Sequence, residues 1–492
     1  MQLPLPLAAL SLPTDGSILP PPSHRIFVNR SLRMDRIEWV GFDMDYTLAI
    51  YRQDQMDRLS IEATAKKMVE LKGYPEHLLD MEYRTDFPIR GLLVDRKQGN
   101  ILKMDRYRYV KRAYHGMREL SIEERRHLYH TKRLRSGTRR YHWVDTLYGL
   151  SEISLYAAAI DELEKDDAPV DFERLFDDVR ACIDLAHRDG SIKEEIKNHL
   201  PMYVKKDLNL GPTLHKLRSA GKRIFVLTNS YPEMTEALMD YLLGDALPEY
   251  PSWQNYFDLV VTASAKPSFF LEGDEFLEVQ EDGSTKPATK LERGAIYMHG
   301  NIHDFEEHLG VKGDQILYVG DHIYGDVLRA KKETAWRTAM IVQEMDVELE
   351  ALSRCTEAMD RSDNLHEARA TLLHELRARQ AALKEVQRAI DANGGSTPTE
   401  LDVARVRHRK AIDKLRARIH ATEDEMNALD DELEQAFHPF WGSLFKAGQE
   451  VSSFGDQVED YACIYTSCVT NLLSYSPLHY FRSPRHRMAH EV

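Results

Sequence analysis

The fold of this chain is decided by residues 41–50, which read GFDMDYTLAI and begin inside the largely apolar run of residues 37–42. The run predicts a buried strand, so that Asp43 and Asp45 stand at its carboxyl end. In open α/β sheets the loops at the carboxyl ends of the strands form the ligand crevice. Two carboxylates two positions apart on such a loop predict a carboxylate nucleophile beside a second acid that moves protons.

Two further strands are predicted downstream. Residues 223–227 (RIFVL) precede Thr228, and residues 315–319 (QILYV) precede Gly320 and Asp321. Helical stretches lie between these runs, which is typical of an α/β fold with a doubly wound parallel sheet. The interval between residues 42 and 223 is far longer than one crossover helix needs, so it predicts an inserted cap.

The remaining chain has a different texture. Leu365, Leu372, Leu376 and Leu383 follow a heptad rhythm that Arg369 interrupts, and a similar rhythm resumes after the helix breaker at residues 393–398. This pattern predicts a helical hairpin that serves as a structural or oligomerising arm. The expected organisation is an arm at residues 1–22, a core at 23–52 and 205–360, the cap at 53–204, the hairpin at 361–437, and a segment at 438–492 that packs on the core.

The composition narrows the class of protein. The net charge of −15 argues against a general nucleic-acid binder, because neutralising phosphates requires a basic surface. No apolar run approaches the roughly 20 residues that a membrane span requires. Four cysteines without a paired CxxC spacing indicate neither a zinc site nor a disulfide framework, and reduced thiols favour a cytoplasmic location.

Four short strings carry the candidate chemistry. Asp43 is the candidate nucleophile toward phosphorus, with Asp45 as acid and then base. Thr228, Asn229 and Ser230 follow the second strand and form a candidate cradle for phosphoryl oxygens. Lys266, which precedes a proline and two aromatic residues, is suited to neutralise the nucleophile and the phosphoryl group. Asp321 and Asp326 add carboxylates after the third strand, and clustered carboxylates without histidine or cysteine partners predict Mg²⁺. Asp43, Asp321 and the backbone carbonyl of Asp45 are expected to hold the ion, with Asp326 in support.

The order of these strings resembles the four motifs of the haloacid dehalogenase superfamily, and Asp45 points to its phosphatases. Longer segments are similar to the cytosolic purine 5′-nucleotidase II family, which hydrolyses IMP and GMP. These segments are residues 24–32 (HRIFVNRSL), 41–51, 73–75 (GYP), 266–270 (KPSFF) and 320–326 (GDHIYGD). The resemblance extends to Tyr461 and to residues 471–473.

The resemblance also implies substrate contacts. Residues 178–193 are similar to the nucleotide-recognition stretch of that family, and they assign contacts to Arg180, Asp184, His187 and Lys193. A carboxylate such as Asp184 accepts the N1–H of a 6-oxopurine, whereas adenine leaves it unpaired. Tyr148 stands where the family has an aromatic residue that stacks on the base.

An effector site and an assembly are implied in the same way. Positions that resemble the purine nucleotide effector site of the family are Arg135, Tyr324, Lys332, Gln457 and Tyr461. Asp145 and Asp460 depart from the family pattern there, and two added acids repel a polyphosphate. The family implies a homo-oligomer, a tetramer.

The expected function is therefore Mg²⁺-dependent hydrolysis of purine nucleoside 5′-monophosphates through an aspartyl phosphate. One alternative is transfer of the same phosphoryl group to a nucleoside instead of water. The other is a non-catalytic scaffold built on the hairpin, which the intact set of mutually repelling acids argues against.

Overall fold

The computed structural model describes residues 20–129, 134, 137–166, 168–392 and 399–484. The chain divides into two compact units, of which the first comprises Met1–Asp346 with Leu444–Val492 and the second Val347–Ser443. Across the described residues, no helix combines the length and the apolar composition that crossing a bilayer demands.

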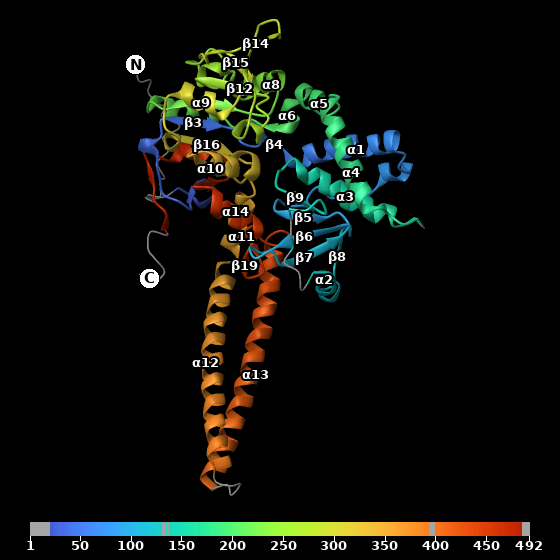
Figure 1. Ribbon diagram of the computed structural model, residues 1–492, viewed down its shortest axis with the longest axis vertical. Coiled ribbons are helices and arrows are strands. Elements are labelled where there is room, and N and C mark those ends of the chain that lie inside the picture. Colours follow the sequence, from blue (N-terminus) through green and yellow to red (C-terminus); the bar gives the residue numbers. More distant parts are fainter. Residues whose placement is uncertain (1–19, 130–133, 135–136, 167, 393–398, 485–492) are drawn as a thin grey trace. The chain divides into compact units, whose positions relative to one another are not determined.

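A ten-stranded sheet forms the centre of the first unit (Figure 1). Its seven middle strands run parallel, and the outer strands β1, β13 and β14 pair antiparallel. In spatial order the strands are β1 (Phe27–Val28), β20 (Ile464–Thr466), β17 (Arg337–Ile341), β16 (Ile316–Gly320), β3 (Trp39–Phe42), β11 (Arg223–Leu227), β12 (Leu259–Thr262), β15 (Ile296–His299), β13 (Phe276–Val279) and β14 (Thr285–Pro287). The predicted α/β fold is confirmed, with antiparallel edges added to the parallel centre.

Packing against the middle strands explains their apolar sequences. All four residues of β3 are buried, and the ring of Phe225 on β11 lies directly over Gly41, where a Cβ would meet the ring carbon Cζ at 2.0 Å. Phe225 also contacts Phe305 and Trp336 in the aromatic core on that face. The helices of this region are α7 (Leu210–Ser219), α8 (Pro232–Leu243), α9 (Ile302–Leu309), α10 (Arg329–Glu333) and α14 (Ser453–Tyr461).

Strands β4 (Ile50–Tyr51) and β10 (Val204–Lys205) pair antiparallel where the chain leaves and re-enters this core. Residues 52–203 between them contain a five-stranded antiparallel sheet in the order β8-β7-β6-β5-β9, and helices α1, α3 and α4 contact one another beside it (Figure 1). The elements are α1 (Gln53–Lys72), β5 (Leu92–Asp95), β6 (Asn100–Met104), β7 (Val110–His115), β8 (Arg118–Glu119), α2 (Ile122–Tyr129), β9 (Tyr141–Val144), α3 (Gly149–Leu163), α4 (Phe172–Arg188), α5 (Lys193–Asn198) and α6 (Leu200–Tyr203).

Two short antiparallel pairs complete the first unit. Strand β2 (Leu32–Arg33) pairs with β21 (Tyr480–Phe481), and β18 (Lys446–Ala447) pairs with β19 (Glu450–Val451). Both pairs involve residues after position 443, so the C-terminal part of the chain belongs to the first unit.

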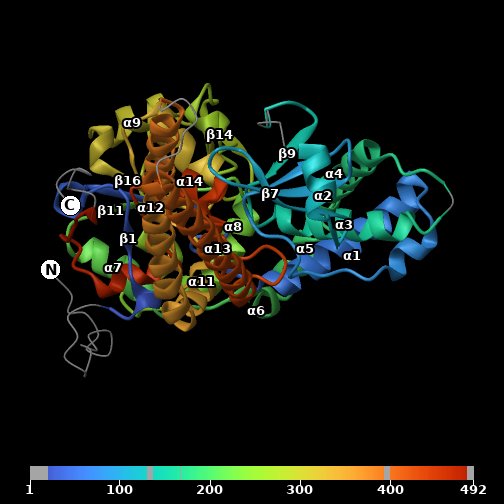
Figure 2. The same cartoon turned by 90° about the horizontal axis from the view of Figure 1, so that it is seen from below.

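The second unit is built on two long helices, α12 (Thr356–Ala392) and α13 (Thr399–Ala436), which follow α11 (Met345–Arg354) and lie side by side (Figures 1 and 2). Leu372 packs against Leu415 and Ile419 between the helices. The guanidinium of Arg369, which interrupts the heptad rhythm, lies 2.7 Å from a carboxylate oxygen of Glu423 on the facing helix. The helix breaker at residues 393–398 lies outside the described residues.

Candidate active site

Three carboxylates meet at the carboxyl ends of the two neighbouring strands β3 and β16. One oxygen each from Asp43, Asp321 and Asp326 lies within 4.8 Å of the others. Asp43 follows β3 and Asp321 follows β16, while Asp326 lies on the π-helical turn Ile323–Leu328. A Cβ at Gly320 would lie 2.5 Å from Asp326 Oδ2, so glycine lets this carboxylate approach the strand end. Three clustered carboxylates suit a divalent cation with oxygen ligands.

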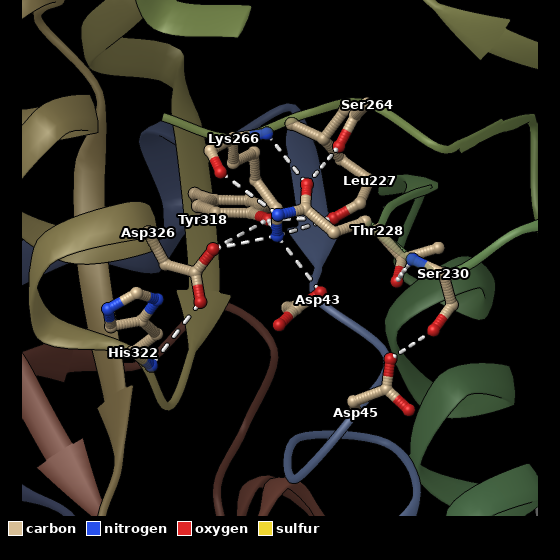
Figure 3. Close-up of polar contacts among 11 residues, drawn as sticks. Asp43, Asp45, Leu227, Thr228, Ser230, Ser264, Lys266, Tyr318, His322 and Asp326 are labelled. Atoms are coloured by element: carbon tan, nitrogen blue, oxygen red, sulfur yellow. Dashed lines mark hydrogen bonds and ion pairs between the residues drawn. The ribbon is translucent and has the colours of Figure 1, made fainter. Parts of the chain in front are cut away.

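Lys266 places one ammonium group among these acids (Figure 3). Its Nζ lies 2.9 Å from Asp43 Oδ1, 2.7 Å from Asp326 Oδ1 and 2.7 Å from the hydroxyl of Tyr318. Burial acts to lower the pKa of Lys266, but the adjoining Asp326 and Asp43 outweigh it and raise that pKa above its ordinary value. The lysine is therefore a fixed cation at the candidate nucleophile.

Burial is the largest influence on the pKa values of Asp43 and Asp321, and it raises both. It raises the pKa of Asp43 well above the ordinary value; Lys266 opposes the rise, and the charges of Asp326 and Asp321 add to it. Burial likewise raises the pKa of Asp321 to about 7, against the lowering effect of Arg90. Closely spaced buried carboxylates favour positive charge between them.

Asp45 points away from this cluster (Figure 3). The hydroxyl of Tyr51 donates to its Oδ1 at 2.6 Å, and the hydroxyl of Ser230 donates to its Oδ2 at 2.6 Å. The next residue, Tyr46, has φ of 56°, a left-handed conformation that is uncommon for a bulky side chain. Both carboxylate oxygens of Asp45 are thus oriented by hydroxyl groups.

The residues after β11 divide into supporting roles. Asn229 Nδ2 donates to the carbonyl of Lys266 at 2.9 Å, and its Oδ1 accepts from the backbone N–H of Lys266 at 2.6 Å. Thr228 Oγ1 accepts from the backbone N–H of Ser230 at 3.1 Å. Asn229 therefore fixes the segment that carries the lysine, and Thr228 shapes the turn that carries Ser230.

A cleft of about 550 Å³ adjoins Asp45, Asn229 and Ser230. Its other walls include residues of β9, α3, α4, α5 and α8 together with His322 and Tyr324. All five residues expected to contact the substrate line it, namely Tyr148, Arg180, Asp184, His187 and Lys193. Tyr148 is 37% exposed as a residue, and its ring packs edge-on against Tyr46 at 4.8 Å between centroids and against His187 at 6.0 Å.

Three buried residues of the site are missing from the sequence expectation. Arg90 bonds both carboxylate oxygens of Glu344, at 2.8 and 2.6 Å, and donates to the Asp321 carbonyl at 2.7 Å. Tyr318 donates to the Leu227 carbonyl at 2.9 Å beside Lys266, and Glu152 lines the cleft. Tyr318 carries a signal, as a hydroxyl inside an apolar strand, whereas Arg90 and Glu152 belong to no string that marks them.

Four of the residues assigned to an effector site lie on three contacting elements, the turn Ile323–Leu328, α10 and α14. Tyr324 lines the cleft, and its hydroxyl accepts a hydrogen bond from Arg329. Lys332 Nζ lies 5.5 Å from the centroid of the Tyr461 ring, and Gln457 is on the same helix, α14. Arg135 lies outside the described residues. Asp145, one of the acids that depart from the family pattern, lies 3.4 Å from His322 Nε2.

Comparison with known proteins places this site in context. A family model described as the 5′ nucleotidase family matches residues 26–492. A 5′-nucleotidase domain-containing protein of Dictyostelium discoideum is 29% identical over 461 residues, which cover 92% of this chain and 72% of that protein. Human 5′-nucleotidase domain-containing protein 2 is 29% identical over 377 residues, covering 73% of this chain and 70% of the human protein.

Similarity to solved structures is weaker. A predicted phosphoglycolate phosphatase from Haemophilus somnus is 12% identical, with a TM-score of 0.28 over 62% of this chain and 86% of that one. The family match, by contrast, spans the core strands, the four strings and the cleft. The chain therefore belongs to the 5′ nucleotidase family, whose members are phosphomonoester hydrolases.

Proposed function

We propose that the protein hydrolyses purine nucleoside 5′-monophosphates, IMP and GMP, with Mg²⁺ and through an aspartyl phosphate. The supporting observation is the continuity of the cleft. It is lined by Asp45, two residues after the Asp43 that pairs with Lys266, and by Tyr148, Arg180 and Asp184. The groups near Asp45 suit a phosphate, and Tyr148, Arg180 and Asp184 suit a planar base.

In the first step, a carboxylate oxygen of Asp43 attacks phosphorus and the bond from phosphorus to the 5′-oxygen breaks. Asp45 donates a proton to that leaving oxygen, which releases the nucleoside. In the second step, Asp45 takes a proton from water as the water oxygen attacks phosphorus. The bond from Asp43 to phosphorus then breaks, and inorganic phosphate and the free carboxylate result.

Electrostatics drive both steps. Lys266 offsets repulsion between the Asp43 carboxylate and the phosphoryl oxygens, and its buried position strengthens this effect. The carboxylates of Asp43, Asp321 and Asp326 carry more negative charge than the single ammonium of Lys266 offsets. Their buried oxygen atoms are ligands of the kind that Mg²⁺ prefers. When bound there, Mg²⁺ neutralises negative charge on the carboxylates and phosphoryl oxygens.

The far end of the cleft suits a 6-oxopurine. Tyr148 offers a partly exposed ring face for stacking, and Asp184 offers an acceptor to N1–H. Adenine has no hydrogen at N1, so AMP leaves an unpaired acceptor, at a cost of about 1–3 kcal/mol. We therefore expect AMP to be a poorer substrate than IMP or GMP.

The test is phosphate release from IMP, GMP and AMP by the full chain, with Mg²⁺ or with a chelator. Asp43→Asn is expected to lower kcat on the order of 10⁴-fold, as is usual for loss of a nucleophile. Asp314→Asn, an exposed aspartate outside the cleft, is the control and should retain full activity. Near wild-type hydrolysis by Asp43→Asn would sink the mechanism, and inactivity of the wild type toward all three nucleotides would favour the scaffold.

The same assay separates hydrolysis from transfer. Added inosine or guanosine becomes a new monophosphate only if a nucleoside replaces water in the second step. Assembly as a tetramer through the hairpin, activation by a purine nucleotide and a cytoplasmic location stay predictions; sedimentation at several protein concentrations tests the first of them.

A further inference from the structure

Glu152 is a buried acid with an unused acceptor in the cleft wall. It lies on α3 one turn after Tyr148, and only 6% of its surface is exposed. Among the described residues, no group donates a hydrogen bond to its Oε1. Arg180 Nη1 lies 3.7 Å away and is instead 2.9 Å from His142 Nε2. The buried Oε1 thus has a lone pair without a donor, and the residue that carries it lines the cleft.

An unpaired acceptor in a buried position is costly, and a ligand that brings an N–H removes that cost. Asp184 on the contacting helix α4 lines the same cleft, and its charge reaches Glu152. Glu152 and Asp184 are therefore two acceptors on contacting helices that line the same cleft.

We propose that Glu152 is a specificity-determining residue that accepts a hydrogen bond from the 2-amino group of guanine while Asp184 accepts from N1–H. The inference rests on the proposed function, because it requires a purine nucleotide in the cleft. Guanine presents these two donors side by side, and hypoxanthine presents only N1–H. The site then favours GMP over IMP, since IMP leaves the Glu152 oxygen unpaired.

The protonation of Glu152 gives this preference a pH dependence. Burial raises its pKa to about 7; Arg180 lowers the value, Asp184 raises it, and Arg96 lowers it. His142, on the facing strand β9, is neutral near pH 7, because burial and Arg180 lower its pKa to about 4. An ionised carboxylate accepts a stronger hydrogen bond than a neutral acid, so the GMP preference rises between pH 6 and pH 8.

The test compares kcat/KM for GMP and IMP at pH 6 and pH 8 in wild type, Glu152→Gln and Glu173→Gln. The last variant makes the same change at an exposed residue of α4 outside the cleft. We expect the GMP-to-IMP ratio to fall about 10-fold in Glu152→Gln and to lose its pH dependence. Glu173→Gln should keep the wild-type ratio.

A substrate series on the wild type needs no variant. Xanthosine 5′-monophosphate carries an oxygen in place of the 2-amino group, so the expected order at pH 8 is GMP, then IMP, then the xanthine nucleotide. IMP equal to or better than GMP overturns the inference, as does an unchanged ratio in Glu152→Gln, and in both cases the nucleotidase function stands. No hydrolysis of either GMP or IMP overturns the proposed function and the inference with it.

Discussion

Lys266 Nζ lies 2.9 Å from Asp43 Oδ1, and the two side chains are 3% and 13% exposed. An ion pair so isolated from water interacts strongly, and each partner depends on the other to remain charged. Loss of one partner therefore affects the stability of the fold as well as the reactivity of Asp43.

Lys266→Met is expected to reduce both properties. Loss of the ammonium leaves Asp43 and Asp326 facing each other, which costs about 3–5 kcal/mol of unfolding free energy for a broken buried pair. Phosphate release should fall by about 10³-fold because charge on the phosphoryl oxygens is no longer offset. Urea unfolding and steady-state kinetics measure the two effects. Lys286→Met, which breaks an exposed pair with Glu278, is the control, and equal stability of the two variants would contradict the argument.

Tyr51→Phe and Ser230→Ala test the orientation of Asp45. Each change removes one of the two 2.6 Å hydrogen bonds to its carboxylate. Hydrogen bonds to charged groups contribute about 1.5–3 kcal/mol, so kcat should fall roughly 10-fold or more in each variant. Tyr83→Phe removes a hydroxyl that donates to Glu62 at 3.2 Å and should leave kcat unchanged. Wild-type kcat in the double variant would show that Asp45 needs neither contact.

Arg90→Lys tests the support of the acidic cluster. A lysine cannot bond both oxygens of Glu344 and the carbonyl of Asp321 at once, as Arg90 does. Loss of such supporting bonds typically weakens metal binding 10–100-fold, so the Mg²⁺ concentration for half-maximal activity should rise by about that factor. Arg84→Lys, at a surface pair with Asp86, is the matched control. An unchanged Mg²⁺ requirement would remove Arg90 from this role.

Glu152 predicts a pH effect on stability that is independent of activity. Its pKa is about 7 in the folded protein and 4.5 in an ordinary glutamate, so the folded state binds more protons between these values. Stability must therefore fall as pH rises from about 4.5 to about 7, by up to about 3 kcal/mol. Glu152→Gln has no carboxyl group at this position, so its unfolding free energy should not show this fall. The difference in unfolding free energy between Glu152→Gln and wild type should therefore shift in favour of the variant from pH 4.5 to pH 8. Urea unfolding at both pH values measures the difference, and parallel curves would contradict the raised pKa.

The sequence pattern predicts the strands β3, β11 and β16 and the residues directly after them. Asp43 and Asp321 directly follow β3 and β16, and parallel strands bring such residues to one edge of the sheet. No pattern predicts β12, the strand that precedes Lys266. The role of Arg90 could not be predicted in this way, because it contacts Asp321 across 231 positions and belongs to no recognisable motif. The burial of Glu152 could not be predicted for a different reason. Its burial depends on the packing of α3 against α4, and a glutamate at helical spacing is usually solvated.

The pairing of Tyr51 with Val204 has a consequence for evolution. Because β4 and β10 bring together the two points where the chain departs from the core and returns to it, a segment of almost any length can join them at small entropic cost. Residues 52–203 supply most of the walls of the cleft, whereas the acids and the lysine lie at the ends of core strands. Exchange of the segment between paralogues can thus redirect the protein to other phosphate esters without rebuilding its reactive groups.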